Sequence, residues 1–421
     1  MKKSDFKEKY ASFALVVFPI LECYNIGSIA LYKFLMLLSC FLLGRGIIGK
    51  KNILPKLLLV FYIYAFTVPQ FNAIATDSMS NFAGSYLTPL LFVLNLAVFI
   101  PFLNYKYVKK YYTFFIIIAC GVFVAQELSF LFLGKRFSAL IPFLRLYVGV
   151  SAADFAPHIA ALNRSCSIFA EPSHFAQYLT PYVAIVMHDL HQKKKVFSVP
   201  VVALSLVFVI LRSGNGLLLI ALLWVFFILF SNTKTILKYT IVIPLSLVIG
   251  IYAFNLFSNT EQGAAVLERT EELDTNYSRV SSGTIRVYRG FWVYNDMNFN
   301  DKLLGVGAGG INDAVDRSRF HWMFYENERY LNNASAFLVA YGAIGTILFV
   351  VFLLSLCDKR RFGTILLVVT FVGLSFMESF FWNTRMLLYI GLAVCLKNIK
   401  DPIEYEENIV NSTEVIPGNR C

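Results

Sequence analysis

Charged residues are scarce in this chain. Asp, Glu, Lys and Arg make up 15% of its 421 residues, whereas a soluble globular domain carries about a quarter. Hydrophobic residues make up 57% of the chain. This balance excludes an ordinary soluble protein and indicates one that is embedded in a lipid bilayer.

Cysteine patterns typical of metal or disulfide sites are also absent. The seven cysteines include no CxxC and no Cys/His cluster, so we expect free thiols, no metal site and no cofactor. The first apolar run follows a lysine-rich stub and has no small-residue cleavage site. We therefore expect a signal anchor rather than a removable signal peptide. The net charge of +11 needs no nucleic acid, because lysine-rich cytoplasmic connections explain it.

Long apolar runs are what the sequence has instead. A bilayer-spanning helix needs about 20 mostly apolar residues, and lysine-rich connections follow every second qualifying run, as expected on the cytoplasmic side. The pattern predicts an all-α polytopic membrane protein of about 12 transmembrane helices with both termini in the cytoplasm. The predicted spans are 11–29, 31–48, 57–75, 86–103, 111–133, 172–190, 196–212, 215–231, 239–257, 333–356, 363–379 and 382–396.

Two outward connections, 134–171 and 258–332, are long and polar. We expect them to be loops of a single transmembrane domain, 1–400, because structureless connections longer than about 15 residues usually have a functional reason. Residues 401–421 form an acidic tail, which we expect to be cytoplasmic and disordered. No internal repeat is visible, and this weakens a transporter interpretation, since many transporters are built from repeated halves.

Arginine and lysine are segregated by predicted side. Cytoplasmic connections carry mostly lysine, and outward segments carry mostly arginine. A guanidinium group binds phosphate in a bidentate manner and stays charged, so the outward arginines suggest a phosphate-bearing ligand. Pairing with acidic residues of the same loops is an equally open explanation. The outward arginines are Arg136, Arg145, Arg164, Arg212, Arg269, Arg279, Arg286, Arg289, Arg317, Arg319, Arg329 and Arg385.

The segment RSCSIFAEPSHFAQYL (164–179) is the most informative part of the chain. Pro172 suits the first turn of a helix. The N-terminus of that helix would face outward with free N–H groups and the positive end of its dipole, which together form an anion site. Glu171 is a candidate general base or site organiser, and His174 lies one turn further. Capping by Glu171 and a structural role for His174 are the competing interpretations.

Further candidates follow along the chain. Arg212 ends an apolar run ahead of a tight hairpin, and a charge near the hydrocarbon points to function because it is costly there. Arg286 and Arg289 precede a glycine-rich segment that lacks the strand–turn–helix context of a nucleotide site, so we interpret those glycines as turn residues. His321 is a candidate acid or base.

Four motifs, in this order, resemble those of the O-antigen polymerase family within the O-antigen ligase and polymerase superfamily. The first is the stretch from Arg164 to Ala176, which contains Glu171, Pro172 and Ser173. The second is Arg212, an arginine after a span and ahead of a short hairpin. The third and fourth are the series Ser282, Arg286, Trp292, Gly305 and Gly307, and the late-span entry Asn332, Gly342 and Gly345, where the last two glycines also predict close helix packing.

The resemblance implies a C-type glycosyltransferase fold in the bacterial inner membrane, with a large periplasmic loop as a lid. It implies metal-independent polymerisation of oligosaccharide units on undecaprenyl pyrophosphate into O-antigen or a similar surface polysaccharide, within lipopolysaccharide biosynthesis. The lipid-linked glycan, the bilayer and a chain-length regulator protein are the partners it suggests. It assigns Glu171, Arg212 and Arg286 to catalysis, and Arg164, Arg289, His174, His321 and Asn332 to substrate binding, the arginines neutralising the diphosphate.

Two alternatives stay open. Ligases of the superfamily carry a His-Asn pair at the last motif, whereas this chain has Leu331 before Asn332 and His321 too far upstream; this favours a polymerase. A flippase or transporter of the lipid-linked oligosaccharide would concentrate charged residues near mid-membrane. Here polar residues gather at the predicted outer rim, with Glu127 as the main exception.

Overall fold

The computed structural model describes residues 3–26, 29–46, 54–73, 86–141, 144–146, 165–192, 282–324 and 331–399. Helices contain 74% of them, and their strands are short, which confirms the predicted helical character of the chain. Predicted spans 196–212, 215–231 and 239–257 lie outside the described residues, as does the tail 401–421.

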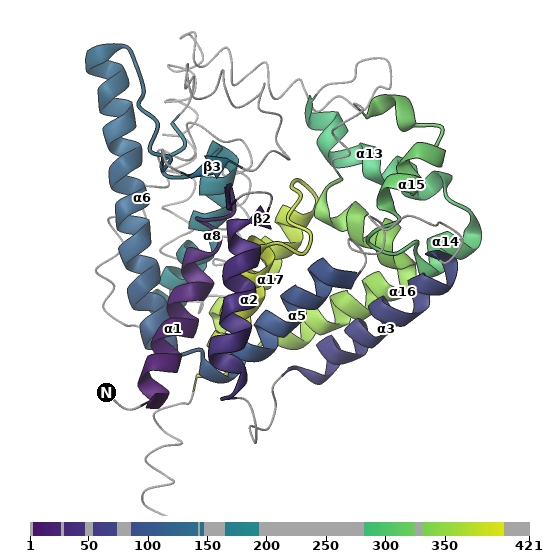
Figure 1. Cartoon of the computed structure of the whole chain (residues 1–421), viewed down its shortest axis with the longest axis horizontal. Coiled ribbons are helices and arrows are strands. Elements are labelled where there is room, and N and C mark those ends of the chain that lie inside the picture. The colour runs from purple at the N-terminus through teal and green to yellow at the C-terminus, as the bar shows by residue number, and fades with distance from the viewer. Residues whose placement is uncertain are drawn as a thin grey trace, which may run out of the picture.

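The described helices follow the apolar runs (Figure 1). Asparagine side chains cap three of them by accepting backbone N–H bonds: Asn104 before α6, Asn332 before α16 and Asn383 before α18. Gly134 ends α6 in the left-handed conformation. The helices that follow predicted spans are α1 (Lys3–Val17), α2 (Leu31–Gly44), α3 (Lys56–Ala73), α5 (Thr88–Phe99), α6 (Tyr105–Leu133), α8 (Pro172–His191), α16 (Asn333–Leu356), α17 (Phe362–Ser375) and α18 (Thr384–Lys397), and the 3-10 turn η2 (Ile100–Phe102) extends α5.

The predicted span 11–29 is wrong in extent. Helix α1 ends at Val17, and β1 (Tyr24–Ile26) follows a turn that contains Glu22. β1 lies between β2 (Ile29–Ala30) and β3 (Arg145–Leu146) in an antiparallel sheet. Glu22 explains the early end of the helix, because its carboxylate binds groups of α18 instead of continuing an apolar run.

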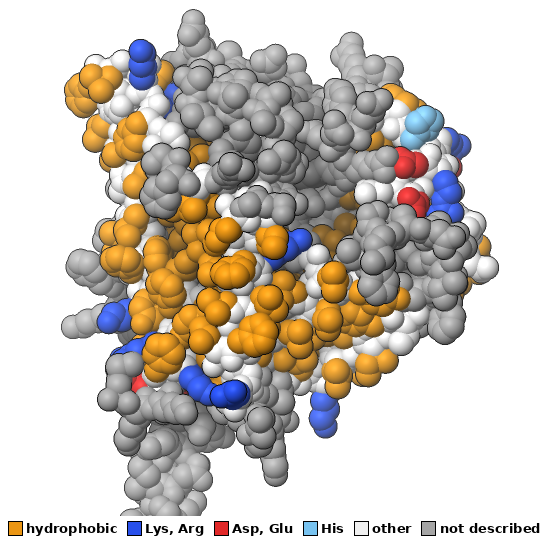
Figure 2. Space-filling model, viewed as in Figure 1, with side chains coloured by type: hydrophobic (Ala, Val, Ile, Leu, Met, Phe, Trp, Pro, Cys, Tyr) orange, Lys and Arg blue, Asp and Glu red, His pale blue; other side chains and the backbone are white. Residues whose placement is uncertain are grey.

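Two described helices, α6 and α16, are long and apolar enough to span a membrane. Large hydrophobic side chains also stay exposed along several helices, and Figure 2 shows them gathered on one face over α6, α1, α2 and α5. Such a wide apolar surface marks a membrane or protein contact. On α2 alone it includes Phe34, Leu37, Phe41 and Leu42.

The helices are ordered so that Lys109 and Arg136 lie at opposite ends. Helices α6 and α8 run antiparallel: Lys109 near the start of α6 pairs with Asp189 near the end of α8, and Gln126 near the end of α6 bonds Ser167 just before α8. Arg136 lies beyond the end of α6, beside Ser165. We call these the lysine end and the arginine end.

Residues 282–324 fold against the first half of α16, at the right of Figure 1. Apolar side chains from α13 and α15 pack there on α16 around a small second core. This segment is most of the described part of the predicted loop 258–332, and it is largely helical. Its elements are α13 (Ser282–Asp296), α14 (Phe299–Leu304), α15 (Ile311–Arg317) and the 3-10 turn η3 (His321–Met323).

Helix α16 is broken at Gly342, whose φ of 63° and ψ of −172° are not helical. The break leaves two carbonyl groups of α16 free to accept hydrogen bonds from the chain after α14. Val306 N–H donates to Val339 O (3.1 Å), and Gly307 N–H donates to Ala340 O (2.8 Å). Gly342 therefore serves a backbone crossing rather than the predicted helix packing. Gly345 does pack closely, because a Cβ there would overlap the ring of Tyr64.

Candidate functional site

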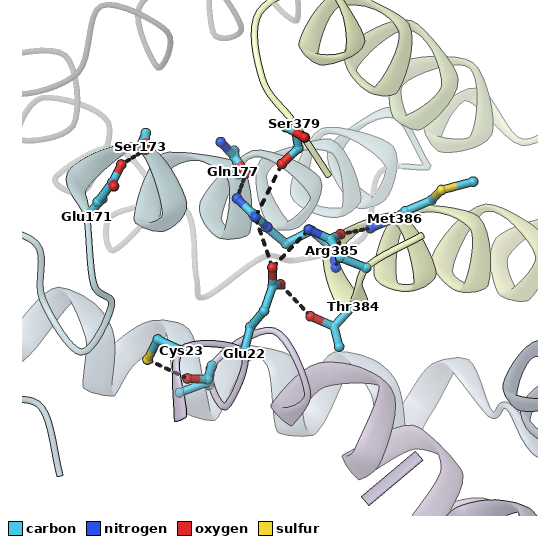
Figure 3. Close-up of polar contacts among 11 residues, drawn as sticks. Glu22, Cys23, Glu171, Ser173, Gln177, Ser379, Thr384, Arg385 and Met386 are labelled. Atoms are coloured by element: carbon cyan, nitrogen blue, oxygen red, sulfur yellow. Dashed lines mark hydrogen bonds and ion pairs between the residues drawn. The ribbon is translucent and has the colours of Figure 1, made fainter. Parts of the chain in front are cut away.

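Arg385 is the centre of a buried polar network at the arginine end (Figure 3). It lies in the first turn of α18, where the helix dipole disfavours a cation. Its guanidinium donates to Glu22 Oε1 (2.9 Å), to Gln177 Oε1 and to the carbonyl of Ser379 (3.5 Å). Burial of this charge is tolerable because Glu22 compensates it.

Glu22 joins the turn after α1 to the start of α18. Besides Arg385, it accepts hydrogen bonds from Asn383 Nδ2 (2.9 Å) and Thr384 Oγ1 (2.6 Å). The carboxylate thus holds three successive residues at the beginning of one helix. The sequence placed Arg385 among the outward arginines but gave neither it nor Glu22 a role in the site.

Helix α8 contributes one row of polar residues to this end. Glu171 directly precedes the helix, and His174 and Gln177 lie in its first two turns, where residues three apart are neighbours. Glu171 and His174 are partly exposed, whereas Gln177 is buried. Ser173 Oγ donates to Glu171 Oε2 (3.0 Å), a local bond at the helix start that is compatible with the capping interpretation.

Asn332 is built into the protein at the start of α16. Its Oδ1 accepts from Ser335 N (2.9 Å) and Ser335 Oγ (2.8 Å), and its Nδ2 donates to Val287 O (2.8 Å) and Phe376 O (3.0 Å). These bonds use both protons and both acceptor positions of the carboxamide. Capping and bridging account for Asn332 fully, and the predicted substrate contact would need one of these bonds to break.

The turn between α17 and α18 lies between α8, which begins in the first motif, and the start of α16, which carries the fourth motif. Ser379 O accepts from Arg385, which also holds Gln177 of α8. Phe376 O and Glu378 O accept from Asn332 and Asn333. Asn332 in turn binds the carbonyl of Val287, the residue that follows Arg286 in α13. The short segment 376–383 is thus linked to α8 through Arg385, and to α13, which carries Arg286, through Asn332.

Arg289 and His321 lie on the α13–η3 side. The Arg289 guanidinium is buried over the ring of Phe324 (4.4 Å) and donates to Met323 O (3.5 Å). This geometry ties η3 to α13. Nδ1 of the exposed His321 lies 3.0 Å from Ser318 O. Neither side chain has a described contact with the network around Arg385.

Asp296 ties the same region together electrostatically. It accepts from the backbone N–H of Arg319 (2.7 Å) and from Ser318 Oγ (3.0 Å), and it pairs with the Arg319 guanidinium (3.1 Å). The backbone N–H bond is the main cause that holds the pKa of Asp296 below its ordinary value of 3.8. For Arg319, the ion-pairing interpretation of outward arginines therefore holds.

Ion pairing also accounts for Arg136. Its guanidinium pairs with Glu127 (3.5 Å), covers the ring of Phe130 (3.7 Å) and donates to Ser165 Oγ (3.2 Å). Glu127, which lies in the predicted span 111–133, thus has a partner. Ser165 directly follows Arg164, which itself lies outside the described residues.

Three predicted arginines fall wholly or partly outside what the structure describes. Arg164 and Arg212 lie outside the described residues, and Arg286 is placed in α13 by its backbone alone. Among the described residues, no three His, Cys, Asp or Glu side chains gather as a metal site would require. No protein-family model matches the chain. No curated protein matches it either.

Proposed function

We propose that this protein polymerises lipid-linked oligosaccharide units by glycosyl transfer at its arginine end. The observation that carries the proposal is the segment 376–383, which hydrogen-bonds directly to the start of α16, where one motif lies, and reaches α8, which begins in another motif, through Arg385 and Gln177. A donor diphosphate and an acceptor sugar must meet at one place, and two motif regions joined by one turn fit that need. Such closeness does not follow from their separation in the sequence.

The arrangement of ends supports a multi-pass protein of about 12 transmembrane helices. Several described lysines lie at one end. Lys109 pairs there with Asp189, which is beside His188, whose ring accepts from Gly363 N–H at the start of α17. Lys397, at the end of α18, binds Ser355 O near the end of α16. With this end cytoplasmic, the network around Arg385 faces the periplasm, and the chain resides in the bacterial inner membrane.

The proposed reaction transfers a growing glycan from its lipid carrier to a new unit. Glu171 accepts the proton of an acceptor hydroxyl, whose oxygen attacks C1 of the donor's reducing-end sugar. The bond between C1 and the diphosphate oxygen breaks, and undecaprenyl pyrophosphate leaves with the bonding electrons. Arg164, Arg212 and Arg286 neutralise the charge that develops on the leaving group, a role for which fixed guanidinium groups are suited.

The environment of Leu331 favours a polymerase over a ligase. Superfamily ligases carry a histidine at this position before the asparagine. Here the Leu331 side chain is buried in the second core with Val293 and Val339. An imidazole at that place would be buried among apolar groups, so the leucine suits packing rather than acid–base chemistry.

The decisive experiment is chain extension by purified full-length protein with defined lipid-linked units, with and without a chelator. Growth of a ladder in both conditions is the expected result. Arg286→Lys should abolish extension while the protein still accumulates in the membrane, because lysine cannot form the bidentate contact. Arg317→Lys is the matched control: Arg317 is an exposed arginine at the end of α15, and its Nε donates to Asp313 O. Full extension by Arg286→Lys would sink the assignment.

A deletion strain separates the rival functions. Loss of a polymerase should leave surface glycans that carry a single repeat unit. Loss of a flippase should leave none, and loss of a ligase should leave polymer that still resides on the lipid carrier.

A further inference from the structure

Gln177 has a buried donor group without a partner among the described residues. The residue is 1% exposed, and its Nε2 makes no hydrogen bond to any described group. A buried amide N–H₂ that lacks acceptors is destabilising, and such groups are few in native proteins. It therefore calls for a functional explanation.

The orientation of this amide is fixed by chemistry. An arginine guanidinium carries donors only, so Gln177 must present its Oε1 to Arg385. Glu22 fixes the guanidinium from the other side. The two protons on Nε2 are consequently turned away from Arg385, as drawn in Figure 3. Glu22 and Arg385 thus determine where the donors of Gln177 point.

The surroundings of Gln177 indicate which kind of ligand would accept hydrogen bonds from its Nε2. Side chains on a helix lean toward its N-terminus, so Gln177 leans toward the first turn of α8. That turn and the first turn of α18 place two positive dipole ends at the arginine end. Donors beside two helix N-termini suit an oxyanion.

We infer that Gln177 binds a phosphate oxygen of the substrate, as a positioning residue held by the Glu22–Arg385 pair. The ligand class is a polyprenyl diphosphate, which is esterified at both ends in the glycan donor and at one end in the released carrier. The inference rests on the proposed function for the identity of that diphosphate, but not for the presence of a diphosphate site.

The test replaces the hydrogen-bond donor of Gln177 with an acceptor. Gln177→Glu keeps the size of the side chain and its bond to Arg385, but replaces the N–H₂ donor with a carboxylate oxygen. The probe is farnesyl diphosphate, titrated calorimetrically into the purified full-length protein in detergent. We expect saturable binding by the wild type and a rise in Kd of at least about tenfold for Gln177→Glu, since one charge-assisted hydrogen bond is worth that much. Thermal unfolding of the same samples checks that the variant is folded.

The matched control is Gln192→Glu. Gln192 is exposed at the lysine end, where its Nε2 donates to Arg360 O (3.3 Å). The Kd of the Gln192→Glu variant for farnesyl diphosphate should therefore equal that of the wild type. If Gln177→Glu does not accumulate, Gln177→Met gives the same comparison, because it also removes the donor. An unchanged Kd in the Gln177 variant overturns the inference. Binding of a neutral oligosaccharide in place of the diphosphate overturns it too.

Failure here and failure of the proposed function are distinguishable. Diphosphate binding that depends on Gln177, in a protein that extends no glycan, would leave the inference standing without the polymerase. Normal extension and an unchanged Kd in Gln177→Glu would leave the polymerase standing without the inference.

Discussion

Gly305 and Gly342 cross with their backbones in contact. A Cβ added to Gly305 would overlap the carbonyl of Ala340, and one added to Gly342 would overlap that of Leu303. Both residues also have positive φ, 84° and 63°, which side chains other than glycine seldom adopt. The glycine-rich segment of the outward loop and the break in α16 are thus two sides of a single contact.

Alanine at either crossing glycine should therefore destabilise the protein. For Gly342→Ala we expect a loss of about 1–3 kcal/mol from backbone strain alone, measured as a lower Tm in detergent. Gly121→Ala is the control, because Gly121 lies within α6 and a Cβ there meets nothing within 4 Å. That variant should be as stable as the wild type or more so. Equal Tm values for the two variants would contradict the crossing.

Loss of one partner of the Glu22–Arg385 pair should be severe. Glu22→Ala leaves the guanidinium buried without its counter-charge, and such losses cost about 3–5 kcal/mol. The double variant Glu22→Ala with Arg385→Met should recover part of this loss, which a double-mutant cycle measures. The comparison pair is Asp296 and Arg319, whose Arg319 side chain is 74% exposed, so that Arg319→Ala should cost at most about 1 kcal/mol. Strict additivity at Glu22 and Arg385 would disprove the coupling.

The two buried glutamines should respond differently to the same substitution. Gln126 is fully bonded: its Nε2 donates to Phe137 O (3.0 Å) and Ser167 O (3.2 Å), and its Oε1 accepts from Ser167 N (2.8 Å). Gln126→Glu removes both donors and should cost about 1–3 kcal/mol. Gln177→Glu should cost less, because it breaks no existing hydrogen bond and strengthens the contact with Arg385. Thermal unfolding of both variants gives the answer, and a larger loss at Gln177 would show that its amide has a structural partner.

The region around Asp296 should loosen in acid. Its pKa in the folded protein is lower than in the unfolded chain, so its contribution to stability is complete above the unfolded value of 3.8 and is lost as pH falls through the lower folded value. Below about pH 4, the packing of η3 on α13 should thus lose stability as the pH falls. Fluorescence of Trp292 and Trp322 can follow the change, and Asp296→Asn should abolish its dependence on pH.

Periodicity and capping could be predicted because they are local. The run 333–356 and the start of a helix at Pro172 agree with the structure, since both depend on neighbours within one turn. The end of α1 was wrong because Glu22 binds residues near the other end of the chain. The break at Gly342 was missed for the same reason, because the groups that fill it come from α14 and the chain after it.

The candidate site was predicted only in part. Glu171 and His174 lie at the start of α8 and Arg286 lies in α13, and their roles in catalysis and substrate binding stay predictions. The pairing of Arg385 with Gln177 and Glu22 was not foreseen. One signal was available: Glu22 and Arg385 are ionisable residues within predicted spans, and such residues are costly there unless they have a role. The sequence does not show that Glu22 and Arg385 are partners, because pairing between distant residues leaves no local pattern.

The connection between α17 and α18 has little freedom to change its length. Its carbonyl groups serve α16 on one side and Arg385 on the other, so one inserted residue would shift the acceptors away from one set of donors. Surface connections usually tolerate insertions. This one is a poor place for an epitope tag or a reporter domain, even though it lies at the end of the bundle where a topology probe would be most informative.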